Sequence, residues 1–478
     1  MNLHPSLDAV ACQPRILIMA SRVAPARELM AFARGVVRDG RARPIVVFSS
    51  TAVAAATLRE PAEGMDIIQP NSEAPGGTHG TSGRGEGTIR AMLRQFARLA
   101  LPRELLAYID TLQQLDRGSV MVSRLIAAYR PVAVVVADDR ALGTDVGAVH
   151  AARRAGIPSL AVPFAVSESN ADAAYRGTKP WFDAKSWRNR VLWQRLLKRH
   201  PEQVGEFNGR QLIFLTPGQI FALSRRGISF SAPWSYGGGP TDRICVFGKA
   251  DVARFRAAGV PEDKMIVSGQ ASLDTLHARR QDHRQTADGL RQRYVLGDES
   301  IVIIALPQHA EHGLMERGHH ETETRQLLSD LRTTGAAVLV SLHPRAHHGD
   351  YRKIIEACGA HLLDEPLLDV IAAADLFVAT HSSTLRWAIL CRIPTVVLDD
   401  MALAAHAFGS GSGLVLLQAR SKVREAAAAL LEDSALRAET IVLLDRMAKD
   451  IDPFDGRNCA RIVDAILTQS TSGKSRAA

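Results

Sequence analysis

The chain has 478 residues, more than one hydrophobic core usually serves, which predicts two domains of roughly 200 residues each. Hydrophobic residues make up 46% and charged residues 23%, a balance typical of a globular protein, and no apolar run approaches the roughly 18 residues needed to span a bilayer. The net charge of +8 indicates an anionic partner but does not choose among phosphates, anionic lipid and nucleic acid.

Neither the N-terminus nor the cysteines indicate export. Asp8 precedes any apolar run, which does not fit a signal peptide. Five cysteines are scattered and none forms a Cys-x-x-Cys pair, so neither a disulfide framework nor a zinc ribbon is indicated. We therefore expect a reducing, cytoplasmic location.

Short β-branched runs alternate with helical stretches along the whole chain, which predicts βα units around parallel sheets. An amphipathic helix over residues 25–38 ends near Gly40 and returns the chain to a strand. The strands expected in the first half are residues 15–19, 44–48, 65–68, 132–137 and 158–162, and those in the second half are 243–247, 265–267, 301–305, 337–342, 376–379 and 394–398.

Glycine-rich segments suggest where the chain is divided. Residues 70–88 contain six glycines and no large apolar residue, which predicts a flexible loop within the first domain. Residues 217–240 are broken by glycines and end in Ser-Tyr-Gly-Gly-Gly-Pro, so we expect the domain junction there. This division gives a first Rossmann-like domain over 1–228 and a second over 240–469, facing each other across a cleft.

The chain after residue 398 is expected to be mainly helical. Helices are predicted over 421–431 and 457–467, and the second is a candidate to cross back to the first domain. The tail over 470–478 is predicted to be disordered.

Three strand ends in the second half carry small, histidine or hydroxyl residues. In open α/β sheets, ligands bind at the carboxyl ends of strands, where the next helix offers free backbone N–H groups. The segments that follow these three strands are LPQHAEHG after residue 305, HPRAHHGDY after 342 and THSST after 379.

The Ser-Ser-Thr run sits where a strand gives way to a helix. Ser382 or Ser383 is a natural N-cap, whose hydroxyl would accept a hydrogen bond from the first turn of the helix. A cap explains one hydroxyl, whereas three in a row leave spare donors that suit a phosphate at the positive end of the helix. Both interpretations stay open at this point, and the other strand ends favour the phosphate.

The His343-Pro344-Arg345 segment ends another of these strands. Pro344 stops the strand and favours an extended His343 at the rim of the sheet. A histidine there could donate to a phosphate oxygen, and Arg345 could do so bidentately.

The pairing of VLVSLHPR (338–345) with LLDVIAAADLFVATHSSTLRWAILCRIPTVVLD (367–399) resembles the C-terminal half of GT-B-fold enzymes that make bacterial surface polymers. The most similar patterns are those of CDP-glycerol glycerophosphotransferases and of bacterial sialyl- and Kdo-transferases. UDP-N-acetylglucosamine 2-epimerases share the fold more distantly. The resemblance covers roughly residues 242–467, including DRICVFGKADVARFRAAGVPEDKMIVSGQASLD (242–274), which looks like the start of the donor domain.

This resemblance implies an α/β protein of two Rossmann-like domains and a nucleotide-activated donor. It also implies that the nucleotide phosphate is held by His343, Pro344, Arg345, His381, Ser382, Ser383 and Thr384, with Gly269 at the edge of the donor domain. GT-B enzymes generally need no metal, so we expect neither a metal nor another cofactor.

In the first half, VAVVVADDRALGTDVGAVHAARRAGIPSLAVPFA (132–165) is similar to the strand-Gly-Asp-helix segment of the epimerases. Asp138 matches the acidic residue of that family. Ala137 stands where the family has glycine, and Asp139 where it often has threonine. The Asp-Ser-Gly-Gly turn of the epimerases is here His381-Ser382-Ser383-Thr384, so the epimerase activity is the alternative and not the leading expectation.

An acceptor hydroxyl needs a base in such a transfer. Asp138 and Asp139 follow a strand of the first domain and are candidates, although Asp139 could equally pair with Arg140 and Asp138 could cap the next helix. His309, which follows the strand over 301–305, is the competing base. Nine of the 16 histidines lie between His309 and His381, but no acid or cysteine stands at metal-ligand spacing around His309 and His312, so no metal site is predicted.

The segment 181–200 carries three of the five tryptophans and six Lys or Arg residues. On a helix, Trp187, Val191 and Leu192 form one apolar stripe flanked by the basic residues. This is either a packed helix with a wet basic face or a peripheral contact with anionic membrane on the cytoplasmic side. A nucleic-acid partner is not expected, because no RNA-binding fingerprint is present.

The leading interpretation is a GT-B transferase, acting on a nucleotide-activated sugar or glycerol. Its acceptor would be a glycan or a lipid-linked molecule in the synthesis of surface polysaccharide. The alternatives are a sugar-nucleotide 2-epimerase or hydrolase, and a non-catalytic subunit that binds a sugar nucleotide.

Overall fold

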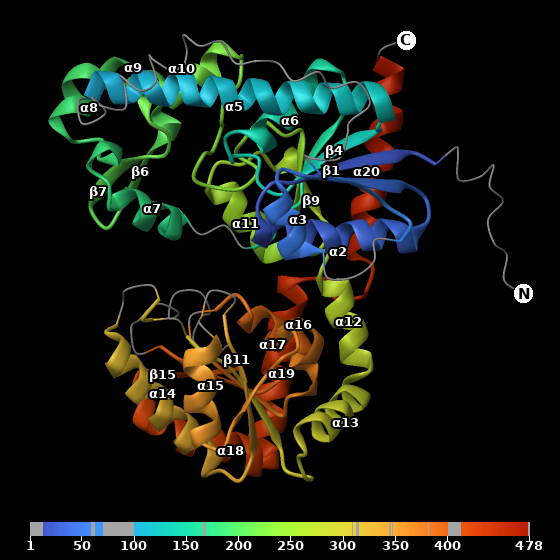
Figure 1. Ribbon diagram of the computed structural model, residues 1–478, viewed down its shortest axis with the longest axis vertical. Helices are drawn as coiled ribbons and strands as arrows, with labels where there is room; N and C mark the ends of the chain where they lie inside the picture. The colour runs from blue at the N-terminus through green and yellow to red at the C-terminus, as the bar shows by residue number, and fades with distance from the viewer. Residues whose placement is uncertain are drawn as a thin grey trace, which may run out of the picture. The chain divides into compact units, whose positions relative to one another are not determined.

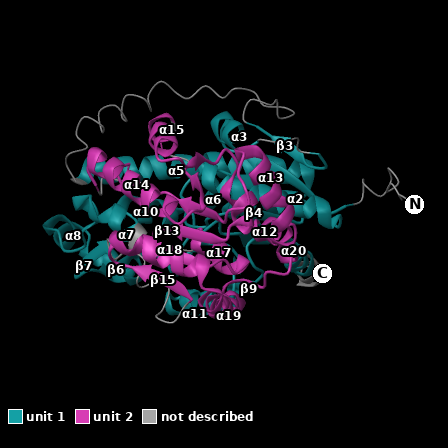
Figure 2. Ribbon diagram, turned by 90° about the horizontal axis from the view of Figure 1, so that it is seen from below, with its two compact units in different colours: residues 1–271, 459–478 teal, residues 272–458 magenta. Residues whose placement is uncertain are grey.

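A computed structural model describes residues 13–58, 63–69, 100–165, 169–307, 309–311, 315–343, 346, 348–380, 382–399 and 413–476. The chain divides into two compact units (Figure 2). Unit 1 comprises Met1–Ala271 and Cys459–Ala478, and unit 2 comprises Ser272–Asn458. The glycine-rich loop expected over 70–88 lies outside the described residues.

Unit 1 is built on a parallel seven-stranded sheet with the order β3-β2-β1-β4-β5-β8-β9. Strands β1 to β3 are added in one direction across the sheet, and the later strands are added in the other direction from β4. The neighbours β1 and β4 therefore mark the switch point of the sheet. The strands are β1 (Arg15–Ala20), β2 (Arg43–Phe48), β3 (Asp66–Ile68), β4 (Ala133–Val136), β5 (Ser159–Ala161), β8 (Arg243–Val246) and β9 (Met265–Val267). A separate antiparallel hairpin consists of β6 (Val204–Phe207) and β7 (Arg210–Ile213).

Helices cover both faces of this sheet, as Figure 1 shows for the long helix α5 and for α2. Alternate residues of β1 explain the two layers, since Ile16 and Ile18 pack with α2 and α20, whereas Leu17 and Met19 pack with α5 and α6. The helices are α2 (Val23–Asp39), α3 (Thr51–Thr57), α5 (Ala100–Tyr129), α6 (Thr144–Arg154), α7 (Ser169–Gly177), α8 (Trp187–Leu192), α9 (Gln194–Arg199), α10 (Pro217–Arg225), α11 (Lys249–Ala257) and α20 (Asn458–Arg476), with short 3₁₀ turns at Pro180–Phe182, Pro201–Gln203 and Glu262–Lys264.

Unit 2 repeats the same strand order in a parallel six-stranded sheet, β12-β11-β10-β13-β14-β15, with its switch point between β10 and β13. The strands are β10 (Ile301–Ala305), β11 (Ala337–Ser341), β12 (His361–Leu362), β13 (Leu376–Ala379), β14 (Thr395–Leu398) and β15 (Leu414–Leu417). The helices are α12 (Leu273–Gln281), α13 (His283–Tyr294), α14 (Arg317–Arg332), α15 (His348–Ala357), α16 (Leu367–Val370), α17 (Leu385–Cys391), α18 (Val423–Glu432) and α19 (Ser434–Ile451), with 3₁₀ turns at Ile371–Ala373 and Arg420–Lys422.

The boundary between the units differs from the expected junction at 217–240. The two strands that follow that segment, β8 and β9, continue the first sheet beside β5, so the unit extends to Ala271. Four of the five glycines of 217–240 are buried within unit 1, and Gly227 is exposed. Gly239 packs against the backbone of Asp139 so closely that a Cβ there would lie 1.9 Å from the Asp139 carbonyl oxygen.

The C-terminal helix α20 belongs to unit 1, as the sequence suggested. Cys459, Ile462, Val463 and Ile466 are buried in the same core as Phe32 of α2. The helix extends to Arg476, so the predicted disordered tail over 470–478 begins too early; residues 477 and 478 lie outside the described residues. Among the described residues, no helix combines the length and apolarity needed to cross a membrane.

Candidate functional site

The switch point of unit 1 gathers charged side chains from two strand ends. Ser21 and Arg22 directly follow β1, and Asp138 is the second residue after β4. Arg22 donates from Nη2 to Asp138 Oδ2 at 3.0 Å. Ser21 donates to Oδ2 of Asp145, a residue in the first turn of α6, at 2.9 Å. The parallel pairing of β1 with β4 places both loops at the same edge.

Asp138 is a buried anion held by two arginines. Its Oδ1 accepts hydrogen bonds from the backbone N–H and from Nε of Arg140, at 3.0 and 3.1 Å. Burial opposes ionisation of Asp138, but the charges of Arg140 and Arg22 outweigh it and hold the pKa of the carboxyl below its usual range. A carboxylate of lowered pKa is a weak proton acceptor, so Asp138 is better suited to hold Arg22 and Arg140 in place than to act as a base.

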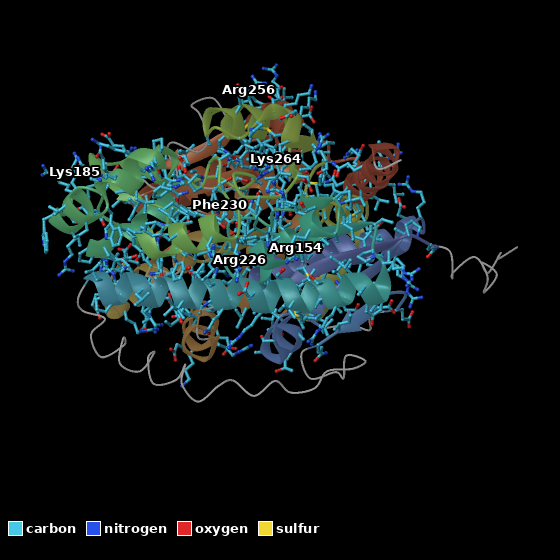
Figure 3. The ribbon with its side chains drawn as sticks, turned by 90° about the horizontal axis from the view of Figure 1, so that it is seen from above. Arg154, Lys185, Arg226, Phe230, Arg256 and Lys264 are labelled. Atoms are coloured by element: carbon cyan, nitrogen blue, oxygen red, sulfur yellow. The ribbon has the colours of Figure 1, made fainter. Side chains whose placement is uncertain are left out.

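Asp139 points the other way and anchors a loop. Its Oδ1 accepts from Gly237 N at 2.9 Å, and its Oδ2 accepts from Thr241 Oγ1 at 2.7 Å. Lys264, which is labelled in Figure 3, has its Nζ 3.4 Å from the same Oδ2, an ion-pair distance. The Asp139 side chain is fully buried, and both of its oxygens are occupied by groups of unit 1. The structure therefore does not favour Asp139 as a catalytic candidate.

Asp145 is the carboxyl at this edge with the properties of a proton carrier. It is buried, and its Oδ1 has no hydrogen-bond partner within the described part of the chain. Burial raises the pKa of Asp145 to about 7, because only Ser21 and the charge of Arg22 offset the loss of water. A carboxyl with a pKa near neutrality can both accept and donate a proton.

The sequence reasoning missed Asp145 because its position suggests an ordinary role. An acid in the first turn of a helix normally stabilises the helix through the macrodipole. The signal that could have found it is Gly147, two residues later. A Cβ at Gly147 would lie 2.9 Å from the Leu115 carbonyl oxygen, so this glycine permits close packing of α5 on α6 and thereby buries the start of α6.

In unit 2, the three strand ends singled out by the sequence lie at one edge of the sheet. Ala305 of β10 pairs with Ser341 of β11 on one side and with Ala379 of β13 on the other. The strands that precede His343 and Ser382 are thus separated by one intervening strand, which spaces the strand ends about 10 Å apart. Pro344, Arg345 and His381 lie outside the described residues.

The Ser-Ser-Thr run does not cap α17 in the expected manner. The cap residue is Thr384, which makes no side-chain cap hydrogen bond, while Ser382 Oγ accepts from Thr384 N at 3.2 Å and pairs with Thr384 Oγ1 at 2.7 Å. Ser383 is exposed, and its hydroxyl forms no hydrogen bond with a described residue. Of the three hydroxyls, that of Ser383 is the one left for a ligand.

His309 belongs to a packed aromatic cluster at the end of β10. It is buried, with its ring centroid 5.7 Å from that of His320, which in turn lies 6.0 Å from the Tyr351 ring. Burial lowers the pKa of His320, so this ring is neutral near pH 7 and donates from Nε2 to the Pro307 carbonyl at 3.1 Å. Tyr351 donates to Glu311 at 2.9 Å. These contacts give His309 a defined position, whatever its role.

Gly269 is not part of this edge. It follows β9 in unit 1, adopts φ of +81°, and its backbone N–H donates to Val246 O at 3.3 Å. The resemblance placed Gly269 at the edge of the donor domain, whereas β9 continues the first sheet. Over the ranges that the structure describes, no group of three or more His, Cys, Asp or Glu side chains is arranged to hold a metal ion; His312 lies outside those ranges.

The basic segment of unit 1 folds into α8 and α9, and its apolar stripe faces solvent. Trp187 is 67% exposed, Val191 70% and Leu192 42%. Trp193 contacts Phe221 of α10, itself 44% exposed, at a ring distance of 6.1 Å. The apolar stripe of Trp187, Val191 and Leu192 is therefore not packed against the rest of unit 1, as the packed-helix interpretation required.

No family model matches the chain, and no curated protein matches it either. Among solved structures, it is similar to UDP-GlcNAc 2-epimerase from Neisseria meningitidis bound to UDP-GlcNAc, with a TM-score of 0.52 and 12% identity over 95% of this chain and 100% of that chain. Another UDP-N-acetylglucosamine 2-epimerase matches with a TM-score of 0.50 and 13% identity over 96% of this chain and 97% of that chain. The spinosyn forosaminyltransferase SpnP matches with a TM-score of 0.49 and 14% identity over 96% and 99% of the two chains.

The likeness to the two epimerases, together with two parallel sheets of the same Rossmann order, shows the GT-B fold that the sequence predicted. At identities of 12% and 13%, this likeness establishes the fold and not the reaction.

Proposed function

We propose that the protein is a GT-B transferase that moves a sugar, or a glycerol phosphate, from a nucleotide-activated donor to an acceptor hydroxyl. The observation that carries the proposal is the carboxyl edge of the unit 2 sheet. There His343 and the exposed hydroxyl of Ser383 lie on either side of the switch point, where doubly wound sheets bind nucleotides. In this proposal they hold the donor phosphate, whose negative charge grows as the leaving group departs.

Unit 1 would supply the proton chemistry. Asp145 is the preferred base for the acceptor hydroxyl because burial raises its pKa to about 7, whereas the lowered pKa of Asp138 makes that carboxylate a poor base. Arg22 is exposed and held by Asp138, so it is the cation at this edge that can also reach a ligand. His309 stays the competing base.

The first experiment is a thermal-shift panel with CMP, CDP, UDP, GDP and their sugars. A nucleotide that binds only the folded protein stabilises it by about 2.7 kcal/mol at a hundredfold excess over Kd, an easily measured shift. We propose that the phosphate is held without metal, so the shift should persist in EDTA. A shift that disappears with EDTA would contradict metal-independent binding, and no shift with any nucleotide would contradict the proposal as a whole.

The second experiment separates the three activities that the fold can host. The nucleotide sugar that binds is incubated with and without a glycan or lipid-linked acceptor, and the products are followed by NMR. Release of free nucleotide only with acceptor supports the transferase. A new sugar epimer, or hydrolysis without acceptor, supports the 2-epimerase or hydrolase suggested by the epimerase-like fold, and binding without turnover supports a sugar-nucleotide-binding subunit.

For the acceptor, we propose a lipid-linked or membrane-borne glycan in the synthesis of surface polysaccharide, reached through the exposed stripe of unit 1. Trp187, Val191 and Leu192 present an apolar surface, and Lys185 lies at the margin of the same unit (Figure 3). The flanking basic residues Lys185, Arg188, Arg190, Arg195, Lys198 and Arg199 form no ion pair with any described residue, so their charge is available to anionic lipid.

A further inference from the structure

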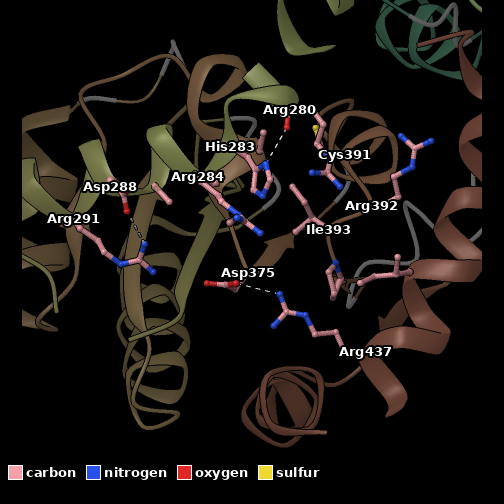
Figure 4. A pocket seen from close by; sticks show the side chains of 16 residues that line it. Arg280, His283, Arg284, Asp288, Arg291, Asp375, Cys391, Arg392, Ile393 and Arg437 are labelled. Atoms are coloured by element: carbon pink, nitrogen blue, oxygen red, sulfur yellow. Dashed lines mark hydrogen bonds and ion pairs between the residues drawn. The ribbon is translucent and has the colours of Figure 1, made fainter. Parts of the chain in front are cut away.

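A pocket of about 430 Å³ opens on unit 2 at the edge opposite the proposed phosphate site (Figure 4). Asp375, which immediately precedes β13, and Pro394, which immediately precedes β14, both line it, so it lies at the amino ends of these strands. Thr380 follows β13 at the other edge. At about 3.3 Å per residue, Asp375 and Thr380 are roughly 16 Å apart, so the pocket cannot be part of the carboxyl-edge site.

The lining of this pocket is strongly cationic. Five arginines face only two carboxylates, those of Asp288 and Asp375, and the remaining lining is largely small or apolar. The arginines come from α12, α13, the end of α17 and α19, and are Arg280, Arg284, Arg291, Arg392 and Arg437. Side chains so far apart in sequence meet because these four helices pack around the amino edge of the sheet.

Two of the arginines are not used by the fold. The other three are held in the pairs Arg291–Asp288 at 3.8 Å, Arg392–Asp445 at 3.0 Å and Arg437–Asp375 at 3.1 Å. Arg280 and Arg284 form no ion pair with any described residue, and Arg284 is exposed. They flank the junction of α12 and α13, where His283 Nδ1 lies 3.1 Å from the Arg280 carbonyl and fixes the turn.

We propose that this pocket is a second anion-binding site, which takes a small ligand carrying two phosphate groups, such as an organic diphosphate. Two unpaired guanidinium groups over a cationic hollow suit two phosphates, because each guanidinium can bind one phosphate bidentately. The neighbouring Ala287, Ile393 and Ile441 provide an apolar wall for the organic part. The site lies apart from the donor site, and it stands whether or not the proposed transferase activity holds.

The test is isothermal titration calorimetry of the full-length protein with inorganic pyrophosphate at fixed ionic strength. Replacing Arg280→Gln or Arg284→Gln should weaken pyrophosphate binding by about tenfold each, since each removes a hydrogen bond to a charged group. The matched control is Arg293→Gln, because Arg293 lies on the same helix α13 but pairs with Glu365 outside the pocket. It should bind pyrophosphate as the parent does.

A donor-site variant distinguishes the two anion sites. Ser383→Ala should leave pyrophosphate binding at the pocket unchanged, and the Arg280→Gln/Arg284→Gln variant should leave nucleotide binding unchanged. The proposal is overturned if the parent does not bind pyrophosphate, or if the double arginine variant binds it as well as the parent. It is also overturned if Arg293→Gln loses as much affinity as the pocket variants, because the attraction would then be diffuse charge.

Discussion

The two units share one strand order but place opposite kinds of chemistry at their switch points. In unit 1 the edge between β1 and β4 holds an ionic network in which Asp138 and Arg140 are buried and Arg22 is exposed, next to the buried carboxyl of Asp145. In unit 2 the edge between β10 and β13 is lined by hydroxyl and histidine residues, and Ser383 is exposed. The same backbone therefore supports an ionic network in one unit and a set of hydroxyl and histidine side chains in the other.

This difference predicts which property substitutions at each site will change, either folding stability or ligand affinity. A buried ion pair that loses one partner leaves an uncompensated charge, so changes in unit 1 should appear first as lost folding stability. An exposed hydroxyl contributes little to folding, so changes in unit 2 should appear as lost ligand affinity.

The strongest test of the contrast is Arg140→Gln. Arg140 contacts Asp138, Asp172 at 2.9 Å and the Pro233 carbonyl at 3.2 Å, and it is 7% exposed. Its removal leaves Asp138 buried with only Arg22 as a cation, and we expect a loss of about 3–5 kcal/mol in the free energy of unfolding, measured with urea. The control Arg153→Gln alters an exposed arginine of α6 and should change stability by no more than about 0.5 kcal/mol. Equal effects of the two would show that the network is not structurally important.

The second test uses pH. Asp145 has a pKa of about 7 in the folded protein against an ordinary value of 3.8, so the folded state keeps a proton that the unfolded state releases. The contribution of Asp145 to stability is thus full below about pH 4 and is lost as pH rises to 7. The loss is about 4 kcal/mol at most, because one pKa unit corresponds to about 1.4 kcal/mol.

Asp145→Asn keeps the shape and removes the titration. Its unfolding free energy should fall less than that of the parent between pH 5 and pH 8, and at pH 8 the variant should be the more stable protein. Asp298→Asn, at an exposed carboxylate, should reproduce the pH profile of the parent. A parent-like profile in Asp145→Asn would show that Asp145 is ionised throughout this range, and would return His309 to first place as the base.

The alternation of strands and helices was readable from the sequence because buried parallel strands are nearly continuous β-branched runs. The run Val134, Val135, Val136 is an example, and every strand predicted from such a run is present. Of the strands that were missed, β12 has only His361 and Leu362, β6 and β7 form a separate hairpin, and β15 is an apolar run in a part of the chain that was expected to be mainly helical. Their pairing depends on neighbours that a local pattern does not reveal.

The candidate sites were predictable only in part, for the same reason. Hydroxyls and histidine after a strand indicate a binding edge, and the register places His343 and Ser382 on one edge. Asp139, and not Asp138, anchors a loop, because it accepts hydrogen bonds from Gly237 and Thr241. These two residues lie about 100 residues away in the sequence, so a local pattern does not reveal them. The raised pKa of Asp145 depends on burial; Gly147 permits the close packing of α6 on α5, but a glycine alone does not reveal that Leu115, about 30 residues earlier, is the residue it packs against.

The third test addresses the carboxyl edge of the unit 2 sheet. Ser383→Ala and His343→Ala each remove a donor to a charged phosphate, worth about 1.5–3 kcal/mol, so nucleotide Kd should rise roughly ten- to a hundredfold. The free energy of unfolding should hardly change for Ser383→Ala, since this side chain is exposed. Ser329→Ala, at an exposed serine of α14, is the control and should bind nucleotide as the parent does. Parent-like affinity in both test variants would mean that the nucleotide phosphate binds elsewhere.

The smallest expected effect extends the comparison to the basic surfaces of the units. The arginine pocket of unit 2 is a hollow with small apolar walls, whereas the basic residues of unit 1 flank an exposed tryptophan, an arrangement suited to a lipid surface.

Arg188→Gln should weaken binding to vesicles containing anionic lipid by about 1 kcal/mol, or roughly fivefold, with no such effect on neutral vesicles. Trp187→Ser should weaken binding to both. Arg256→Gln changes an exposed arginine of the same unit that pairs with Glu262 away from α8 and α9, and it should leave vesicle binding unchanged. If Arg256→Gln and Arg188→Gln weaken binding equally, the attraction comes from the overall charge of +8 and not from the exposed stripe.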